Sequence, residues 1–437
     1  MDQTTDIHLP PTIARSDPHT PLQPVPASEL LDHELARKEQ LRKKGNLMIG
    51  CRELDEYVLL GGFERGSVVG VSAEEEDIGL SIGLQTAANL VAERLGKALI
   101  ITTLPVTVLL PKLQKLLVSS LQEDPRNLKT RVQECLERIS ISRVFDIEGL
   151  WQVLGELEET SERMPLPVTQ GTETGPKRDA ATSEQRVQQR TEVQDSEEED
   201  SLSLSESPHP QSPTAQPRDG SSRYSEPPRS SLPDLILITH TSALLSTLFA
   251  ARDKPTAHET TALLSSHLQY LTRSPAFGNP LVILLNSTTS PLSQGHDDIV
   301  TITANDEPRQ AKFPEPTHSS IFSPPPQVTY PPGHTFQRNK PSFGQVFAQM
   351  LDLHLLCTRV PRTNEDAAAA VAGLGLEFVS YVWVVEVLLD EIGVYERTDF
   401  DDYGVRRNRE QRWGAVDVDE LKGGRVVDAL EGRSQGQ

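Results

Sequence analysis

Short runs of apolar, often β-branched residues alternate along this chain with longer stretches of helical character. The runs expected as strands are residues 67–72, 98–103, 140–145, 234–239 and 280–286. The stretches expected as helices are residues 80–95, 107–122, 127–138, 147–160, 241–251 and 258–272. Apolar strands that alternate with helices are typical of a parallel sheet covered on both faces. The sequence therefore predicts an α/β fold with a mostly parallel central sheet and helices on both of its faces.

Composition shifts divide the chain into ordered segments and long insertions. With 36% hydrophobic residues and 33 prolines in 437 residues, the chain is expected to form one core interrupted by disorder. The expected segments are a disordered N-terminal tail (1–26), a helix (27–45), the first half of the core (46–160), a disordered acidic, Ser- and Pro-rich insertion (161–232), the second half of the core (233–287), a Pro-rich loop (288–340), the C-terminal strands of the core (341–420) and a tail (421–437).

Five motifs occur in the order found in RecA-like recombinases and their paralogues. They are IGCRELDEYVLLGGFERGS (49–67), QTAANL (85–90), DLILITHTSAL (234–244), LVILLNST (281–288) and KPSFGQVFAQMLDLHL (340–355). RWGAVDV (412–418) is similar to the edge strand that ends many cores of this family. The chain resembles a divergent, fungal-type member of the family, and the resemblance implies a RecA-like P-loop NTPase-type core.

The expected phosphate-binding loop is replaced by an acidic stretch. A P-loop, GxxxxGK[ST], gathers backbone N–H groups and a lysine around phosphate, while its hydroxyl holds magnesium. Here the lysine position falls on Gly79 and the hydroxyl position on Leu80. The corresponding stretch consists of Ala73, Glu74, Glu75, Glu76, Asp77, Ile78, Gly79 and Leu80. Its four carboxylates are expected to repel phosphate. The alternative is an ordinary solvated turn whose acidic residues favour the positive end of a helix.

Two further groups needed for ATP hydrolysis are also missing. In the family, the second nucleotide-site strand ends in an Asp that organises magnesium, and here that position is Thr239. The general-base Glu normally follows the strand after the P-loop helix, but no Asp or Glu occurs between residues 96 and 121. In-line attack on a γ-phosphate requires these groups. The sequence therefore predicts a degenerate nucleotide site, no cofactor, no catalytic residue and no bound metal.

Charge and cysteine content restrict the cell compartment and the partners. The net charge of −21 argues against a broad electrostatic grip on DNA or a membrane. Three cysteines without CxxC spacing suggest reduced thiols, and the polar, acidic N-terminus does not resemble a signal peptide. No apolar run approaches the roughly 20 residues of a membrane span. We expect a nuclear protein, with the cytoplasm as the alternative location.

Two basic regions are candidates for weak contact with single-stranded DNA. In the Pro-rich loop, aromatic residues are interleaved with Lys312, Arg338 and Lys340, a pattern that can stack on bases and neutralise phosphates. A second cluster comprises Arg406, Arg407 and Arg409. The alternatives are a disordered linker in the first case and simple charge balance with neighbouring aspartates in the second.

These observations favour a non-catalytic RecA-like recombinase paralogue that serves as a scaffold or accessory partner in DNA recombination and repair. Its partners would be RecA-like homologues in a hetero-oligomer, and the acidic stretch would be a permanent protein interface. The alternative is a pseudo-ATPase subunit of an Elongator-like assembly in tRNA modification. An active ATPase is not expected. A recombinase filament is not expected either, because no phenylalanine is followed by alanine three residues later, as the family's tether requires.

Overall fold

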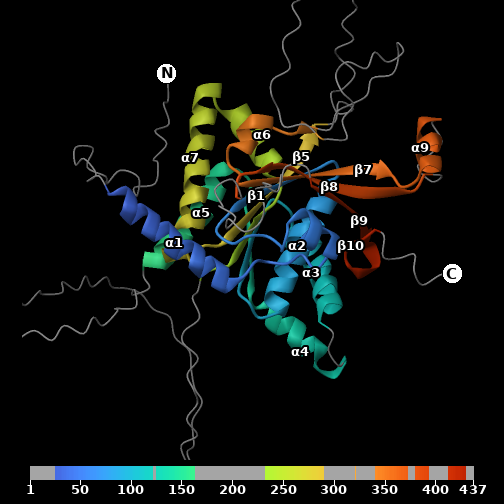
Figure 1. The fold of residues 1–437 in the computed structure, drawn as a ribbon, viewed down its shortest axis with the longest axis horizontal. Coiled ribbons are helices and arrows are strands. Elements are labelled where there is room, and N and C mark those ends of the chain that lie inside the picture. Colours follow the sequence, from blue (N-terminus) through green and yellow to red (C-terminus); the bar gives the residue numbers. More distant parts are fainter. Residues whose placement is uncertain are drawn as a thin grey trace, which may run out of the picture. The chain divides into compact units, whose positions relative to one another are not determined.

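The computed structural model describes residues 25–121, 125–162, 232–289, 320, 340–372, 379–392 and 412–429. The segments expected to be disordered, 1–26 and 161–232, and the expected Pro-rich loop, 288–340, lie almost entirely outside these residues, so those expectations remain predictions. Figure 1 shows the arrangement of the described elements.

The helices are α1 (Ala27–Lys44), α2 (Glu76–Ala92), α3 (Val106–Ser120), α4 (Pro125–Leu136), α5 (Ile147–Glu162), α6 (Thr241–Ala251), α7 (Lys254–Arg273), α8 (Gly344–Ala348) and α9 (Asn364–Val371), with a π-helical turn η2 (Glu53–Val58) and 3-10 turns η3 (Pro275–Phe277) and η7 (Glu420–Lys422). The strands are β1 (Val68–Ala73), β2 (Ala98–Thr102), β3 (Ile139–Arg143), β4 (Leu235–Ile238), β5 (Leu281–Thr289), β6 (Lys340–Pro341), β7 (Leu353–Pro361), β8 (Tyr381–Asp390), β9 (Trp413–Asp419) and β10 (Arg425–Asp428).

Most strands of the described chain form one sheet in the order β10-β9-β8-β7-β1-β5-β4-β2-β3, and β6 pairs with β5. The pairings from β7 through β1, β5, β4 and β2 to β3 are all parallel. β8, β9 and β10 extend this sheet in antiparallel fashion. The predicted α/β class with a mostly parallel central sheet is therefore confirmed.

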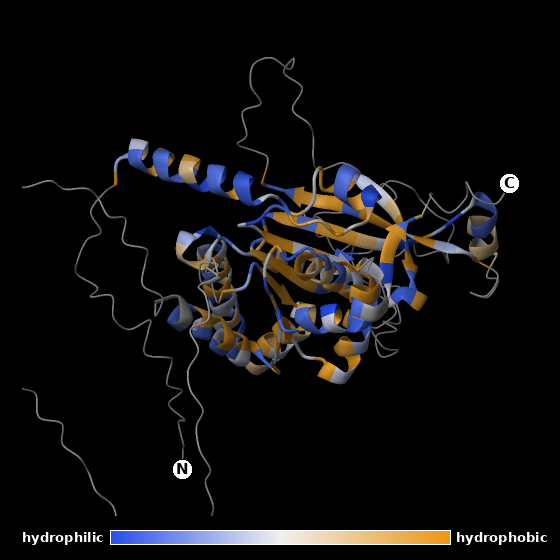
Figure 2. Cartoon of the chain, turned by 90° about the horizontal axis from the view of Figure 1, so that it is seen from below, coloured by the Kyte–Doolittle hydropathy of each residue, from blue (hydrophilic) through white to orange (hydrophobic). Residues whose placement is uncertain are grey.

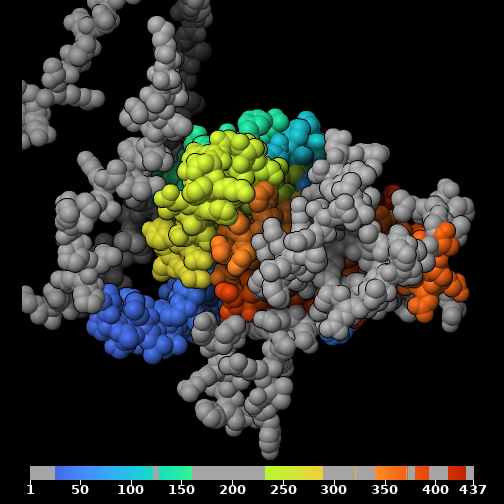
Figure 3. Space-filling model, turned by 90° about the horizontal axis from the view of Figure 1, so that it is seen from above, coloured from blue at the N-terminus to red at the C-terminus, as the bar shows by residue number. Residues whose placement is uncertain are grey.

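Alternate residues of the central strands face two separate apolar layers. Val69, Leu237 and Ile283 belong to a buried cluster that includes side chains of α2, α3 and α4. Their neighbours Val68 and Ile236 belong to a second cluster, formed with α5, α6, α7 and α8. Successive side chains of a strand point to opposite faces, so a sheet that is apolar on both faces needs helices on both. Figure 2 shows the apolar strands between these helices, and Figure 3 shows the face covered by α6 and α7, in yellow-green.

The structure differs from the expected elements at the C-terminal end of the core. Residues 421–437 were expected to be a tail, but β10 lies within them and Val426 is fully buried. Residues 412–418 were expected to be an edge strand, whereas β9 pairs with β8 on one side and β10 on the other. A strand as short as β10 carries little sequence signal, because only one side chain of its four is buried.

Burial lowers the reactivity of the three cysteines. Cys51, Cys135 and Cys357 are all buried and unpaired. Burial raises the thiol pKa at all three positions, to about 12 for Cys357, and a hydrogen bond from Cys51 Sγ to Asp428 (3.0 Å) adds to the effect at Cys51. Because the thiolate is the reactive form, native thiols should be poor nucleophiles.

We therefore expect iodoacetamide at pH 8 to alkylate the folded protein far more slowly than the unfolded chain, since the thiolate fraction falls roughly tenfold for each unit of raised pKa. Mass spectrometry of alkylated peptides, with and without guanidinium, measures the three sites separately. Rapid labelling of Cys357 in the folded protein would contradict this expectation.

No helix in the described part of the chain is long and apolar enough to cross a membrane.

Candidate functional site

The predicted degenerate site lies at the carboxyl edge of the parallel strands. Ala73 ends β1 and is buried, and it pairs with Ser287 on β5 and Cys357 on β7. Thr239 follows β4 directly. Carboxyl ends of neighbouring parallel strands are where ligands bind in open α/β sheets. The structure thus brings Thr239 and residues 73–80 to one edge, although they are far apart in sequence.

Helix α2 begins earlier than the sequence predicted. It was expected to start at Leu80 but starts at Glu76, so Glu76 and Asp77 lie in its first turn and only Glu74 and Glu75 remain between strand and helix. Carboxylates are favourable at the positive end of the helix dipole. The acidic run therefore includes the helix start, in agreement with the alternative interpretation of the sequence.

Each of the four carboxylates is held by a group from another part of the chain. Glu74 accepts a hydrogen bond from the backbone N–H of Arg359 (3.0 Å), and Glu75 pairs with the guanidinium of the same arginine (2.8 Å). Asp77 pairs with Lys112 on α3 (2.7 Å). These contacts fix the turn to β7 on one side and to α3 on the other. The acidic side chains are thus partly neutralised, which the sequence analysis did not anticipate.

Glu76 starts a chain of polar contacts along the edge of the sheet. Its carboxylate lies 3.1 Å from His240 Nε2, His240 Nδ1 lies 2.8 Å from Thr239 Oγ1, and Thr239 Oγ1 donates to Thr102 Oγ1 at 2.8 Å. The hydrogen bond with His240 holds the pKa of Glu76 below its usual value, although partial burial opposes this shift. The hydrogen bond between Thr239 and Thr102 therefore links the end of β4 to the end of β2.

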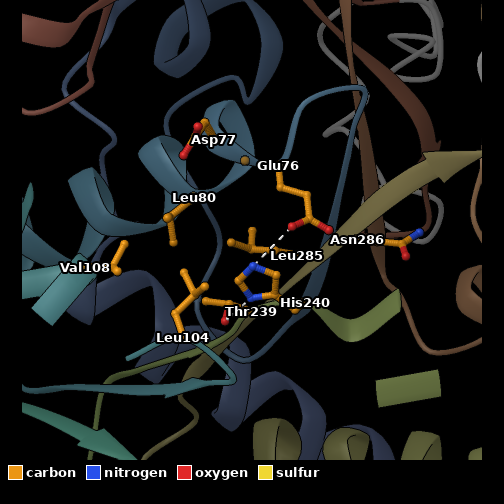
Figure 4. Close-up of a pocket in the computed structure, with 10 residues that line it drawn as sticks. Glu76, Asp77, Leu80, Leu104, Val108, Thr239, His240, Leu285 and Asn286 are labelled. Carbon is orange, nitrogen blue, oxygen red and sulfur yellow. Dashed lines mark hydrogen bonds and ion pairs between the residues drawn. The ribbon is translucent and has the colours of Figure 1, made fainter. Parts of the chain in front are cut away.

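A cavity of about 250 Å³ lies between these groups. Figure 4 shows His240 pointing to Glu76 and the aliphatic side chains gathered beside them. The lining residues are Glu76, Asp77, Gly79, Leu80, Leu104, Val108, Thr239, His240, Leu285 and Asn286. Within this lining, His240 is the only side chain that can carry a positive charge. Carboxylates beside aliphatic groups suit a cationic or apolar ligand group better than a phosphate.

Gly79, which the resemblance places at the P-loop lysine position, faces apolar atoms. A Cβ built on Gly79 would lie 3.7 Å from Ala73 Cβ, 3.7 Å from Val71 Cγ1 and 3.9 Å from Leu285 Cδ2. Leu80, at the hydroxyl position, is itself buried. A lysine side chain at residue 79 would therefore start among aliphatic atoms, and its ammonium would reach a cavity that Glu76 and Asp77 also line.

Beside the cavity lies a buried polar network that the sequence analysis missed. Ser72 Oγ contacts His354 Nε2 at 2.8 Å, and Asn286 Nδ2 donates to Ser72 Oγ (3.1 Å) and to the carbonyl of Ser342 (3.0 Å). Asn286 Oδ1 has no hydrogen-bond partner among the described residues. Ser72 pairs with Asn286 across β1 and β5, and His354 lies on β7 two positions before the partner of Ser72. This signal becomes visible only once the strand order is known.

Most of the residues predicted to contact DNA lie outside the part of the chain that the structure describes. Lys340 lies on β6, which pairs with the end of β5. Lys312, Arg338, Arg406, Arg407 and Arg409 lie outside the described residues. Among the described residues, no group of three or more His, Cys, Asp or Glu side chains could hold a metal ion.

No family model matches the sequence, and no curated protein matches it. A solved structure with a similar fold is a crystal structure of the RadB recombinase, which is 12% identical over 87% of this chain and 99% of that chain, with a TM-score of 0.41. The fold class therefore rests on the strand order and on the two helical layers.

Proposed function

We propose that this chain is a non-catalytic, divergent RecA-like recombinase paralogue of fungal type, a nuclear scaffold or accessory partner in DNA recombination and repair. The observation that supports the non-catalytic part is the internal pairing of the β1–α2 turn. Glu74, Glu75, Glu76 and Asp77 each contact a group of the same chain, and these contacts hold four carboxylates at the edge where a nucleotide's phosphates would lie. The ordered sequence motifs support the recombination part.

The proposed mechanism is binding through a fixed surface. The β1–α2 turn is held by contacts to β7, α3 and the start of α6, so it is ordered without a bound nucleotide. Its exposed carboxylates carry four negative charges, which Arg359 and Lys112 offset only in part. We infer that this surface receives a RecA-like homologue in a hetero-oligomer, with weak contact to single-stranded DNA through regions such as Lys340.

We expect no measurable binding or hydrolysis of Mg-ATP by the purified protein. Introducing Gly79→Lys and Leu80→Thr should not create binding, because Glu76 and Asp77 would remain in the lining of the same cavity, where they attract the new ammonium and repel phosphate. Titration calorimetry and a phosphate-release assay measure the two activities. Saturable binding of Mg-ATP by the unaltered protein would refute the non-catalytic proposal.

The partner proposal is tested by affinity purification from native cells and mass spectrometry. We expect a RecA-like homologue to be recovered with the unaltered protein and lost from the triple variant Glu74→Lys, Glu75→Lys, Glu76→Lys. Exposed ion pairs contribute only about 0–1 kcal/mol each, so this variant should remain folded, which circular dichroism checks. A matched control, Glu29→Lys, Asp32→Lys, Glu56→Lys, makes the same change in net charge away from the turn.

Retention of the homologue by the triple variant would count against the turn as the interface. Recovery of Elongator subunits in place of a recombinase would transfer the function to tRNA modification and reject the recombination proposal.

A further inference from the structure

A short turn that packs on the middle of α3 presents an exposed leucine. Leu421 lies in η7, between β9 and β10, and its side chain is 91% exposed. Asp419 caps the turn by accepting hydrogen bonds from the backbone N–H groups of Leu421 (3.1 Å) and Lys422 (3.2 Å). The capped turn orders the backbone around Leu421, so binding of its side chain by a partner would not have to order that backbone.

Close packing against α3 and α2 holds this turn in place. Gly423 has a φ of 83°, and a Cβ there would lie 2.7 Å from Lys115 Cβ and 2.9 Å from the carbonyl oxygen of Lys112. On the next strand, the backbone of Val426 exchanges two hydrogen bonds with the side chain of Gln85 on α2 (2.7 and 3.2 Å). The position of Leu421 is thus set by the core and not by a loose loop.

An open groove of about 540 Å³ lies between the turn and α3. Its lining residues are Gln114, Lys115, Val118, Ser119, Leu421, Lys422 and Arg425. This lining contains three cationic side chains and no carboxylate. Val118 is 46% exposed, and Arg425 donates to the carbonyl of Ser119 (3.0 Å), which keeps its guanidinium beside the helix. Asp419 neutralises Lys422 in part (3.1 Å), so Lys115 and Arg425 carry most of the local positive charge.

We propose that this groove is a docking site for an acidic, leucine-bearing helical segment of a partner protein. The chain has a net charge of −21, but the lining of this groove is basic. An acidic ligand would pair with the cationic side chains of the groove and avoid the repulsion by carboxylates on other surfaces of the chain. Leu421 and Val118 also offer an apolar surface, which a leucine on the ligand helix can contact. Nucleic acid fits less well, because phosphates would leave the aliphatic side chains of Leu421 and Val118 uncovered. The groove is separate from the β1–α2 turn.

Fluorescence anisotropy with the full-length chain tests the chemistry of the ligand. The main probe is a labelled helical peptide of about 16 residues, long enough to hold some helix in water, with leucines spaced i, i+4 and i+7 and glutamates elsewhere. The comparison probes are the same peptide with serine for leucine, the same peptide with lysine for glutamate, and a single-stranded oligonucleotide. We expect the leucine–glutamate peptide to bind at least about tenfold more tightly than any other probe.

Two variants locate the binding. Leu421→Asp and Lys115→Glu should each weaken peptide binding by about tenfold, the range expected for a central contact. The control Leu263→Asp changes an exposed leucine on α7 and should have no effect. Equal binding by the Leu421→Asp and unaltered proteins would overturn the proposal, as would tighter binding of the oligonucleotide or of the serine peptide.

A photo-crosslinking residue at position 421, used in the native cell, identifies the occupant. Crosslinks to an acidic, leucine-containing segment of another protein are expected, and the control position 263 should not give them. Crosslinks to this chain's own residues 163–231, or to a second copy of the chain, would overturn the assignment of the groove to a partner protein.

Discussion

Replacing Arg65 with alanine is expected to lower the free energy of unfolding by about 3–5 kcal/mol, the range found when one member of a buried ion pair is removed. Arg65 is 3% exposed, and its guanidinium pairs with Asp234 (2.9 Å) and donates to the carbonyl of Gly45 (3.1 Å). Asp234 begins the chain segment that enters β4, and Gly45 follows α1. One side chain therefore joins the end of α1, the approach to β1 and the entry to β4.

Guanidinium denaturation followed by circular dichroism measures this effect. The matched control is Arg42→Ala, which removes an exposed pair with Glu39 and should change the free energy of unfolding by less than about 1 kcal/mol. Asp234→Asn combined with Arg65→Ala should cost less than the sum of the two single changes, because the uncompensated carboxylate is gone. A loss below 1 kcal/mol for Arg65→Ala alone would show that the pair does not hold these segments together.

Replacing Phe347 with alanine is expected to cost about 3–5 kcal/mol through lost burial and the resulting cavity. Phe347 is fully buried in the layer with α5, α6 and α7, and its ring meets His354 edge-on with centroids 5.3 Å apart. It also packs on Gly70 of β1, where an added Cβ would lie 2.9 Å from Phe347 Cε1 and 2.3 Å from Leu351 Cδ1.

This close approach allows a second test by a double-mutant cycle. Gly70→Ala alone should destabilise the protein by about 1–3 kcal/mol through overpacking. In combination with Phe347→Ala, part of that cost should disappear, because the new methyl group can occupy space left by the ring. Phe145→Ala, at a side chain that is 68% exposed, is the control and should cost about 1 kcal/mol or less. Strict additivity of the first two changes would contradict the packing of α8 on β1.

The sequence was sufficient to predict most elements of the core. Apolar runs such as 98–103 and 234–239 and helical stretches such as 241–251 became β2, β4 and α6 within a residue or so. The spacing of hydrophobic residues is a local property, so it predicts a helix or a strand even when the elements that pack against it are unknown. The sequence alone also shows that residue 79 is not a lysine and that residue 239 is not an Asp, because the identity of a side chain does not depend on the fold.

The sequence could not predict what the acidic turn contacts. Glu75 pairs with Arg359 and Glu76 with His240, residues that only the strand order β7-β1-β5-β4 brings to one edge. The same is true of the groove beside Leu421, which exists because a β-hairpin packs its glycine turn on α3. Local pattern determined the elements and the absence of a lysine at residue 79. Long-range pairing, which depends on the summed packing of the whole core, decided which side chains pair with the acidic turn and that a groove with three cationic side chains lies beside Leu421 on an acidic chain.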